Sequence, residues 1–72
     1  MREYKSTIEK FMPFMKPGWV ACDQHGTWCW FSTKPTRELR YWDTRGEYCE
    51  ISHVFSIAPS KDWKNSLIRV GE

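Results

Sequence analysis

The sequence predicts a small α+β domain that is mainly β: a strongly bent antiparallel sheet or SH3-like half-open barrel of about four to five strands, with an N-terminal helix and a short C-terminal helix. Two observations predict this class. Apolar residues near the start recur with helical spacing, whereas from residue 19 onward they alternate with a period of two. In addition, the segments DQHG at 23–26 and DTRG at 43–46 both place Asp first and Gly fourth, as tight turns between strands do.

A domain of this size has little core. The chain has 72 residues, which we take as one domain spanning 1–72, and a chain this short buries only about 60% of the surface of its unfolded form. Five Trp, four Phe and three Tyr supply large apolar side chains that compensate for part of this deficit. We therefore expect aromatic residues to be the main source of stability.

The first predicted element is a helix over residues 3–12. Its apolar residues recur at the spacing of one helical face, namely Tyr4, Ile8, Phe11, Met12 and Met15. Pro13 limits this helix, and the segment KPG at 16–18 turns the chain into the first strand.

Two hairpins of the same design form the predicted sheet over residues 18–57. In each turn the Asp side chain bonds the following backbone, and the Gly adopts the left-handed conformation that closes a three-residue loop with a bulge. The first hairpin then pairs Cys22 with Trp28, Ala21 with Cys29, Val20 with Trp30 and Trp19 with Phe31. The second pairs Trp42 with Tyr48, Tyr41 with Cys49, Arg40 with Glu50 and Leu39 with Ile51.

The pairing of Arg40 with Glu50 indicates which face of this sheet meets water. The opposite face is then the predicted core, with the inward residues Trp19, Ala21, Cys29, Phe31, Leu39, Tyr41, Cys49 and Ile51. The outer face is also rich in aromatic residues, its members being Val20, Cys22, Trp28, Trp30, Arg40, Trp42, Tyr48 and Glu50. Because a solvated face does not hold several Trp, either the chain's own helices cover part of it or a partner does.

Both interpretations of this outer face stay open. The small core favours cover by the N-terminal helix or by the segment around Trp63. In the functional interpretation, a subset stays exposed and binds a partner, because Trp, Tyr and Arg dominate the energetics of protein interfaces. The predicted partner-binding residues are Trp28, Arg40, Trp42 and Tyr48.

The chain after the second hairpin is predicted to hold a long strand and a short helix. The strand continues through SHVFSIAP to residue 57 with a bend near Ser52 or His53, because eleven residues is long for one strand, and Pro59 stops it. The helix spans 60–68, with Ser60 as its N-cap and with Trp63 and Leu67 four residues apart on one face.

Charge and hydropathy predict a soluble, cytosolic protein without a membrane partner. The net charge is +2, and eleven Lys and Arg are interspersed with nine Asp and Glu, which argues against binding driven by phosphate charge. No stretch approaches the 18 apolar residues or so of a transmembrane helix, and the segment MREYKSTIEK is too polar for a signal peptide. Three Cys, an odd number, are interpreted as reduced thiols rather than a disulfide framework.

The Cys and His residues have the side chains of a zinc site but not a common spacing. They are Cys22, His25, Cys29, Cys49 and His53. With the bulged turn, Cys22 and Cys29 face opposite sides of the sheet, whereas a two-residue turn at His25 and Gly26 would place them opposite one another on one face. The role of Asp23 in the bulged turn favours the first arrangement, so we expect neither a metal nor another cofactor.

Catalysis has little support, so we expect a protein that is not an enzyme. His25 lies at a turn tip, while Cys29 and Cys49 are interpreted as inert core thiols. Asp23 and Asp43 are explained by their turns, and no phosphate-binding, zinc-protease or serine-hydrolase motif occurs.

Single-stranded nucleic acid is the alternative ligand of such a small β-barrel. Bases stack on exposed aromatic residues beside Lys and Arg, and the candidate residues are Trp28, Trp42, Tyr48, Arg37, Arg40 and Arg45. The near-neutral charge makes nucleic acid the weaker expectation, because Asp43, Glu47 and Glu50 lie among these residues and repel phosphates.

Two motifs resemble those of short, uncharacterised proteins of tailed bacteriophages and prophages. They are W-V-A-x-D-x-x-G-x-W at Trp19–Trp28 and D-W-x-x-S-L at Asp62–Leu67, and the resemblance covers residues 17–71. It implies a phage-encoded accessory protein in the host cytoplasm, a class that often inhibits or redirects host enzymes or defence systems. Together with the residues above, it predicts a non-enzymatic binder of a host protein, or of a second copy of itself, that acts as an inhibitor or modulator.

Overall fold

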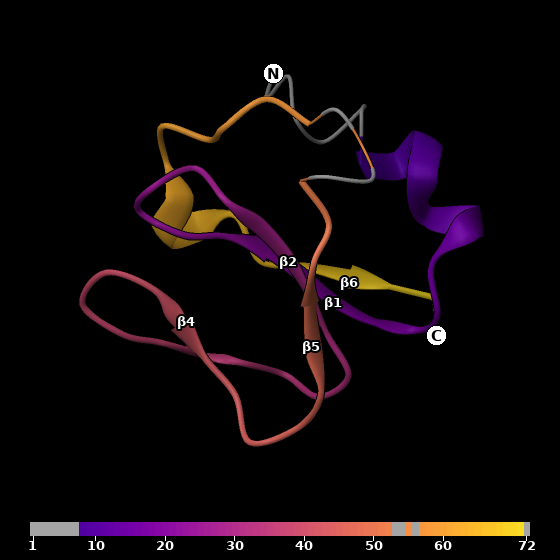
Figure 1. The fold of residues 1–72 in the computed structure, drawn as a ribbon, viewed down its shortest axis with the longest axis horizontal. Helices are drawn as coiled ribbons and strands as arrows, with labels where there is room; N and C mark the ends of the chain where they lie inside the picture. The colour runs from indigo at the N-terminus through magenta and orange to yellow at the C-terminus, as the bar shows by residue number, and fades with distance from the viewer. Residues whose placement is uncertain (1–7, 53–54, 56, 72) are drawn as a thin grey trace.

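The computed structural model of the protein describes residues 8–52, 55 and 57–71 (Figure 1). An α-helical segment at 8–11 leads into the 3₁₀ turn η1 (Met12–Phe14). The strands are β1 (Gly18–Cys22), β2 (Trp28–Phe31), β3 (Thr36–Arg37), β4 (Trp42–Asp43), β5 (Tyr48–Glu50) and β6 (Ile68–Val70), and a second 3₁₀ turn, η2 (Trp63–Asn65), precedes β6. Within the described residues, four strands form an antiparallel main sheet in the order β5-β2-β1-β6, and β3 pairs with β4.

The predicted fold class is confirmed at the level of a small, mainly β domain with an antiparallel sheet after a helical segment. The strands of the described residues do not close a barrel. The α-helical segment ends at residue 11, and Pro13 lies in the tighter turn η1, which agrees with the limit that proline sets on a helix. The start of the predicted helix, residues 3–7, lies outside the described residues.

The first hairpin has the predicted register and the predicted turn. Residues 19–22 pair with residues 28–31, from Trp19 with Phe31 to Cys22 with Trp28. Asp23 Oδ1 accepts hydrogen bonds from the backbone N–H groups of His25 (2.8 Å) and Thr27 (3.1 Å). Gly26 has a φ of +89°, the left-handed conformation that the bulge requires. The turn chemistry of Asp23 and Gly26 therefore sets this hairpin.

The predicted core face of this hairpin is wrong. The buried cluster contains Val20, Cys22 and Trp28 from the face that we predicted to be the outer one, together with Ile8, Ile51, Ile57 and Val70. We call this the core face of the main sheet. Phe11, Met12, Met15, Phe55 and Trp63 pack against it, so the chain covers the face itself, which was the first of our two interpretations.

The reversal follows from what the segment after the sheet contacts. The Trp28 indole N–H donates to the Ala58 carbonyl (2.9 Å), so the chain at 57–63 lies against the core face and not the opposite one. Among the residues predicted to be inward, Ala21 and Phe31 are buried at 1% and 4% exposure, while Leu39 is 82% and Tyr41 52% exposed. The side of the main sheet that carries Ala21 and Phe31 is named the cleft face below. Its residues include Trp19, Ala21, Cys29, Phe31 and Tyr48.

The second predicted hairpin does not form. β4 pairs with β3 instead, placing Asp43 opposite Thr36 and Trp42 opposite Arg37. β5 pairs with the second edge of β2 in the register Cys29–Glu50, Trp30–Cys49 and Phe31–Tyr48. Two backbone hydrogen bonds extend that pairing at either end, from Ser32 N to Glu47 O and from Ile51 N to Trp28 O, both 2.9 Å.

The turn at 43–46 explains the failure. Thr44, not Asp43, bonds the turn backbone, because Thr44 Oγ1 accepts from Gly46 N at 3.0 Å. Gly46 does not have a positive φ; a Cβ at this position would lie 2.6 Å from Ser32 Oγ. Gly46 is thus needed for the close approach of β5 to the end of β2, whereas Gly26 is needed for its left-handed backbone. The same Asp-x-x-Gly pattern therefore needs its glycine for a different physical reason in each of the two turns.

The predicted helix at 60–68 is also wrong. η2 is a single 3₁₀ turn, and residues 68–70 form β6, which pairs antiparallel with β1. Asp62 and not Ser60 occupies the position before η2. The predicted strand through 57 ends at Glu50, and the chain turns at Ser52, where we expected a bend. His53 lies outside the described residues.

Candidate functional site

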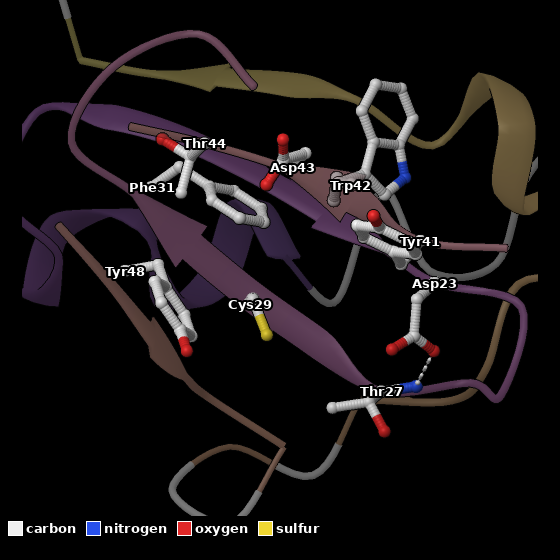
Figure 2. Close-up of a pocket in the computed structure, with 10 residues that line it drawn as sticks. Asp23, Thr27, Cys29, Phe31, Tyr41, Trp42, Asp43, Thr44 and Tyr48 are labelled. Atoms are coloured by element: carbon white, nitrogen blue, oxygen red, sulfur yellow. Dashed lines mark hydrogen bonds between the residues drawn. The ribbon is translucent and has the colours of Figure 1, made fainter. Parts of the chain in front are cut away.

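A cleft of about 290 Å³ lies between the cleft face of the main sheet and the segment that contains β4 (Figure 2). Its lining residues are Ala21, Asp23, Thr27, Cys29, Phe31, Tyr41, Trp42, Asp43, Thr44 and Tyr48. Figure 2 shows Cys29, Phe31 and Tyr48 on the side of the main sheet. Tyr41, Trp42 and Asp43 form the facing side. The cleft thus combines aromatic walls with carboxylates at its edge.

The main sheet supplies the floor of the cleft. Phe31 lies on β2 directly opposite Tyr48 on β5, and their rings stack with centroids 6.4 Å apart and an interplanar angle of 30°. Phe31 is buried, while Tyr48 is 67% exposed. The pairing of β5 with β2 therefore brings an exposed tyrosine to the cleft, at a position that the predicted second hairpin would not have given it.

The facing side is held in place by hydrogen bonds to the first hairpin. The Trp42 indole N–H donates to the Cys22 carbonyl at 2.9 Å, and its ring meets that of Trp63 edge-on with centroids 6.5 Å apart. The backbone N–H of Gln24 donates to the Arg40 carbonyl at 3.2 Å. These contacts orient β4 and the turn before it relative to the main sheet.

The turn between β3 and β4, residues 38–41, is named the hairpin tip. Glu38 N donates to Tyr41 O at 2.8 Å, which closes the turn. Leu39 is 82% and Tyr41 52% exposed, and Arg40 between them is exposed as well. Large apolar side chains on a protruding, hydrogen-bonded turn are typical of surfaces that bind other proteins.

The cleft is electrostatically negative. Asp23 and Asp43 line it, and of the described residues no Lys or Arg does. The pKa of the Cys29 thiol is raised from its ordinary value of 9.0 to about 11, chiefly by burial and then by the charges of Asp23 and Glu50 and by the neighbouring thiols. Cys29 is therefore a neutral thiol near pH 7 and supplies no thiolate to the cleft.

The structure separates the four residues that we predicted to bind a partner. Trp28 is fully buried at 0% exposure, so its assignment to a docking surface is wrong. Trp42 and Tyr48 both line the cleft, and Arg40 lies at the hairpin tip. The alternative nucleic-acid surface loses Trp28 in the same way, and its Trp42 and Tyr48 share the cleft with Asp43.

Sequence reasoning missed Leu39, Tyr41 and Asp43. The first two were placed in the core because the second hairpin was expected. Asp43 was explained by a turn whose backbone is bonded by the side chain of Thr44 instead. The signal that separates the two Asp-x-x-Gly segments is Thr44, whose hydroxyl competes with Asp43 for the turn backbone. Gln24 at the corresponding position has no such hydroxyl.

The Cys and His residues do not gather into a metal site in the part of the chain that the structure describes. Cys22 is buried on the core face, Cys29 lines the cleft, and His25 is exposed at the turn of the first hairpin. All three cysteines are free thiols. The bulged turn, with Cys22 opposite Trp28, is what keeps Cys22 and Cys29 on opposite faces.

The comparisons with known proteins add no relative. No protein-family model matches the chain, and neither a curated protein nor a solved structure matches it. In the described residues, none of the helical segments is long and apolar enough to span a bilayer. The cleft and the hairpin tip are the features from which a function can be inferred.

Proposed function

We propose that this protein is a non-catalytic protein-binding module that docks through the hairpin tip and the adjoining rim of the cleft. The observation that carries the proposal is the exposure of Leu39, 82%, beside a half-exposed Tyr41 on a hydrogen-bonded turn. Burying these side chains against a partner removes apolar surface from water, which is the main source of affinity at protein interfaces.

The tip is preorganised, which lowers the entropic cost of binding. The bonds from Glu38 N to Tyr41 O and from Gln24 N to Arg40 O hold its backbone, and the Trp42 indole bond holds the strand that follows. A turn that is already ordered loses little conformational freedom on docking. Arg40 adds a side chain of a type that is enriched in interface hot spots.

The chemistry of the cleft supports binding rather than catalysis. Its thiol has a raised pKa and stays protonated near pH 7, and of the described residues no His lines the cleft to act as a base. The phage resemblance suggests the partner class. We propose a protein of the bacterial host, bound in the cytoplasm and inhibited or modulated by this module.

Replacement of Leu39 tests this proposal. A chain with a photoreactive phenylalanine analogue in place of Arg40 would cross-link the partner in a bacterial host lysate, after which affinities are measured on the purified partner. Leu39→Ala should weaken binding by about tenfold or more, because a buried apolar anchor is worth roughly 1.4 kcal/mol or more. Far-ultraviolet circular dichroism should show an unchanged fold.

Phe14→Ala is the matched control. Phe14 is 78% exposed and belongs to η1, which Figure 1 places at the opposite end of the molecule from the β4 segment. It should bind the partner as the unchanged chain does. Equal binding by the Leu39 and Phe14 variants, or a loss confined to the Phe14 variant, would refute docking through the tip. Self-association that Leu39→Ala abolishes would identify the partner as a second copy.

A further inference from the structure

We propose that the cleft binds the cationic end of one lysine or arginine side chain that the partner protein presents, an inference that rests on the proposed function. The cleft lies directly beside the hairpin tip, since Tyr41 belongs to both. A partner docked on Leu39 therefore has its surface over the cleft. The site has three properties that suit a cation: aromatic walls, carboxylates that pair with no cation among the described residues, and the size of one side-chain end.

The aromatic walls provide ring surface for a cation. Phe31, Tyr41 and Tyr48 line the cleft from both of its sides (Figure 2). Trp42 lines it as well, but its indole ring is directed away from these rings, toward the Cys22 carbonyl and Trp63. An ammonium or guanidinium group over such rings is attracted to their electron-rich faces by the cation–π interaction.

The same sheet face already carries one such arrangement within the chain. Trp19 lies next to Phe31 across the β1–β2 pairing, with Lys34 Nζ 5.5 Å and Arg69 Cζ 5.6 Å from its ring centroid. Within the described residues, the four cleft aromatics have no comparable cation. The cleft aromatics can therefore make with a cation from the partner the same kind of contact that Trp19 makes with Lys34 and Arg69.

The carboxylates provide the charge that selects a cation over a neutral group. Asp43 is exposed, and no hydrogen bond or ion pair of its carboxylate is found with the described residues. Asp23 Oδ1 accepts both turn hydrogen bonds, and Figure 2 shows its other oxygen on the side of the cleft. The raised pKa of Cys29, to which Asp23 and Glu50 contribute, is consistent with this negative field.

The dimensions favour one side-chain end over a larger ligand. At about 290 Å³, the cleft lies at the lower limit of small-molecule pockets, roughly 300–1,000 Å³. It has room for an ammonium or guanidinium group with part of its aliphatic stem, and the aromatic walls suit that stem as well. The negative edge disfavours an acidic or phosphorylated occupant.

Amino-acid probes test the cleft independently of the partner. We would titrate the chain labelled with ¹³C and ¹⁵N with N-acetyl-lysine methylamide and N-acetyl-arginine methylamide, following the Trp42 indole N–H resonance and the ring ¹H–¹³C resonances of Tyr41 and Tyr48. Both probes should shift these signals and saturate. The neutral analogues, Nε-acetyl-lysine and citrulline derivatives, should bind about tenfold more weakly, because they lack the charge.

Asp43→Asn is the variant of choice, because it removes a charge from an exposed cleft residue while keeping its size. It should weaken both cationic probes severalfold and leave the rest of the spectrum unchanged. Glu9→Gln removes the same charge from an exposed residue of the N-terminal helical segment and should have no effect. Neutral analogues that bind equally well, or an unchanged affinity in the Asp43 variant, would overturn the inference.

A competition experiment connects the cleft to the partner and separates the two proposals. Saturating lysine probe should weaken binding of the purified partner; a probe that occupies the cleft without this effect overturns its assignment to a partner side chain. If the cationic probes do not bind while Leu39→Ala still abolishes partner binding, the cation inference fails and the docking proposal stands. If Leu39→Ala binds normally, the docking proposal fails whatever the probes do.

Discussion

At the residue scale, two serines with buried hydroxyl oxygens show how differently such a group can contribute. Ser66 is fully buried, and its Oγ accepts a hydrogen bond from the Cys22 backbone N–H at 2.8 Å and donates to the Trp63 carbonyl at 2.7 Å. It completes the backbone pairing of β1 where β6 has not yet begun. The Oγ of Ser60 is also buried but has no hydrogen-bond partner among the described residues.

Ser66→Ala should therefore lower the free energy of unfolding by about 1–3 kcal/mol, because it leaves the Cys22 N–H buried without an acceptor. Ser60→Ala removes a hydroxyl that makes no bond and should change stability by less than about 0.5 kcal/mol, or raise it. Urea denaturation followed by tryptophan fluorescence measures both. Similar losses in the two variants would show that volume, and not the hydrogen bond of Ser66, matters.

The three cysteines differ in environment in a way that alkylation can measure. Cys49 is exposed, whereas burial raises the pKa of Cys29 to about 11. Because the thiolate is the reactive form, iodoacetamide at pH 8 should modify Cys49 well before Cys29, as read by peptide mass spectrometry. The rate at Cys29 should keep rising toward pH 11. In urea the two should react alike, and equal rates in the folded protein would contradict the burial of Cys29.

The same shift sets the sign of a stability effect at high pH. The folded-state pKa of Cys29 lies above the ordinary thiol value of 9.0, so the Cys29 thiol is a stronger acid in the unfolded chain than in the folded protein. Its contribution to stability is complete below pH 9 and is lost as the pH rises to about 11. Cys29→Ser should flatten this part of the pH dependence of unfolding.

At the scale of elements, the hairpin of β3 and β4 depends on a few long-range contacts. Its two strands are two residues each, too short to be stable alone. The indole bond of Trp42 to the Cys22 carbonyl, the edge-on contact with Trp63 and the bond from Gln24 to Arg40 attach the hairpin to the rest of the protein. Both proposed binding features, the tip and the cleft, depend on this attachment.

Trp42→Phe tests that dependence, because it keeps an aromatic ring and removes the indole N–H. Losing the bond should lower the free energy of local opening of residues 36–43 by roughly 1 kcal/mol. Amide hydrogen exchange should become about fivefold faster in this segment, while exchange in β1 and β2 is unchanged. Uniformly faster exchange would instead assign Trp42 to the global stability of the main sheet.

At the scale of the whole molecule, β1 and β2 form a central layer that is covered on both faces by different means. The core face is covered by residues 8–15 and, further along the chain, by Phe55, Ile57 and Trp63. The cleft face is covered in part by the β4 segment, which leaves the cleft open. This arrangement explains why both faces of the first hairpin are apolar: a short chain with two covering layers needs large side chains on each side of its central strands.

The first hairpin could be predicted from the sequence, down to its register. Its determinants are local, since Asp23 accepts hydrogen bonds from the backbone N–H groups of His25 and Thr27 and Gly26 adopts the left-handed conformation. Interactions within five residues require no knowledge of the rest of the chain. The helical segment before Pro13 was predictable for the same reason, and the bend at Ser52 was predictable from the length of the strand that was expected there. Of the candidate site, Trp42, Tyr48 and Arg40 were identified as accessible aromatic and basic residues, although their arrangement was not.

What the tertiary structure decided is which strand β5 joins and which face of the sheet is the core. β5 pairs with the free edge of β2 and not with β4. The side chains of Ser32 and Ser52 stabilise the β2–β5 pairing, because they accept additional hydrogen bonds at its two ends. The core face is set by contacts between residues that are far apart in the sequence, such as Trp28 with Ala58, separated by 30 positions, and Cys22 with Ser66, separated by 44. When both faces of a hairpin are apolar, the sequence of the hairpin does not indicate which face the rest of the chain will cover. The path of segments that are distant in the sequence decides it.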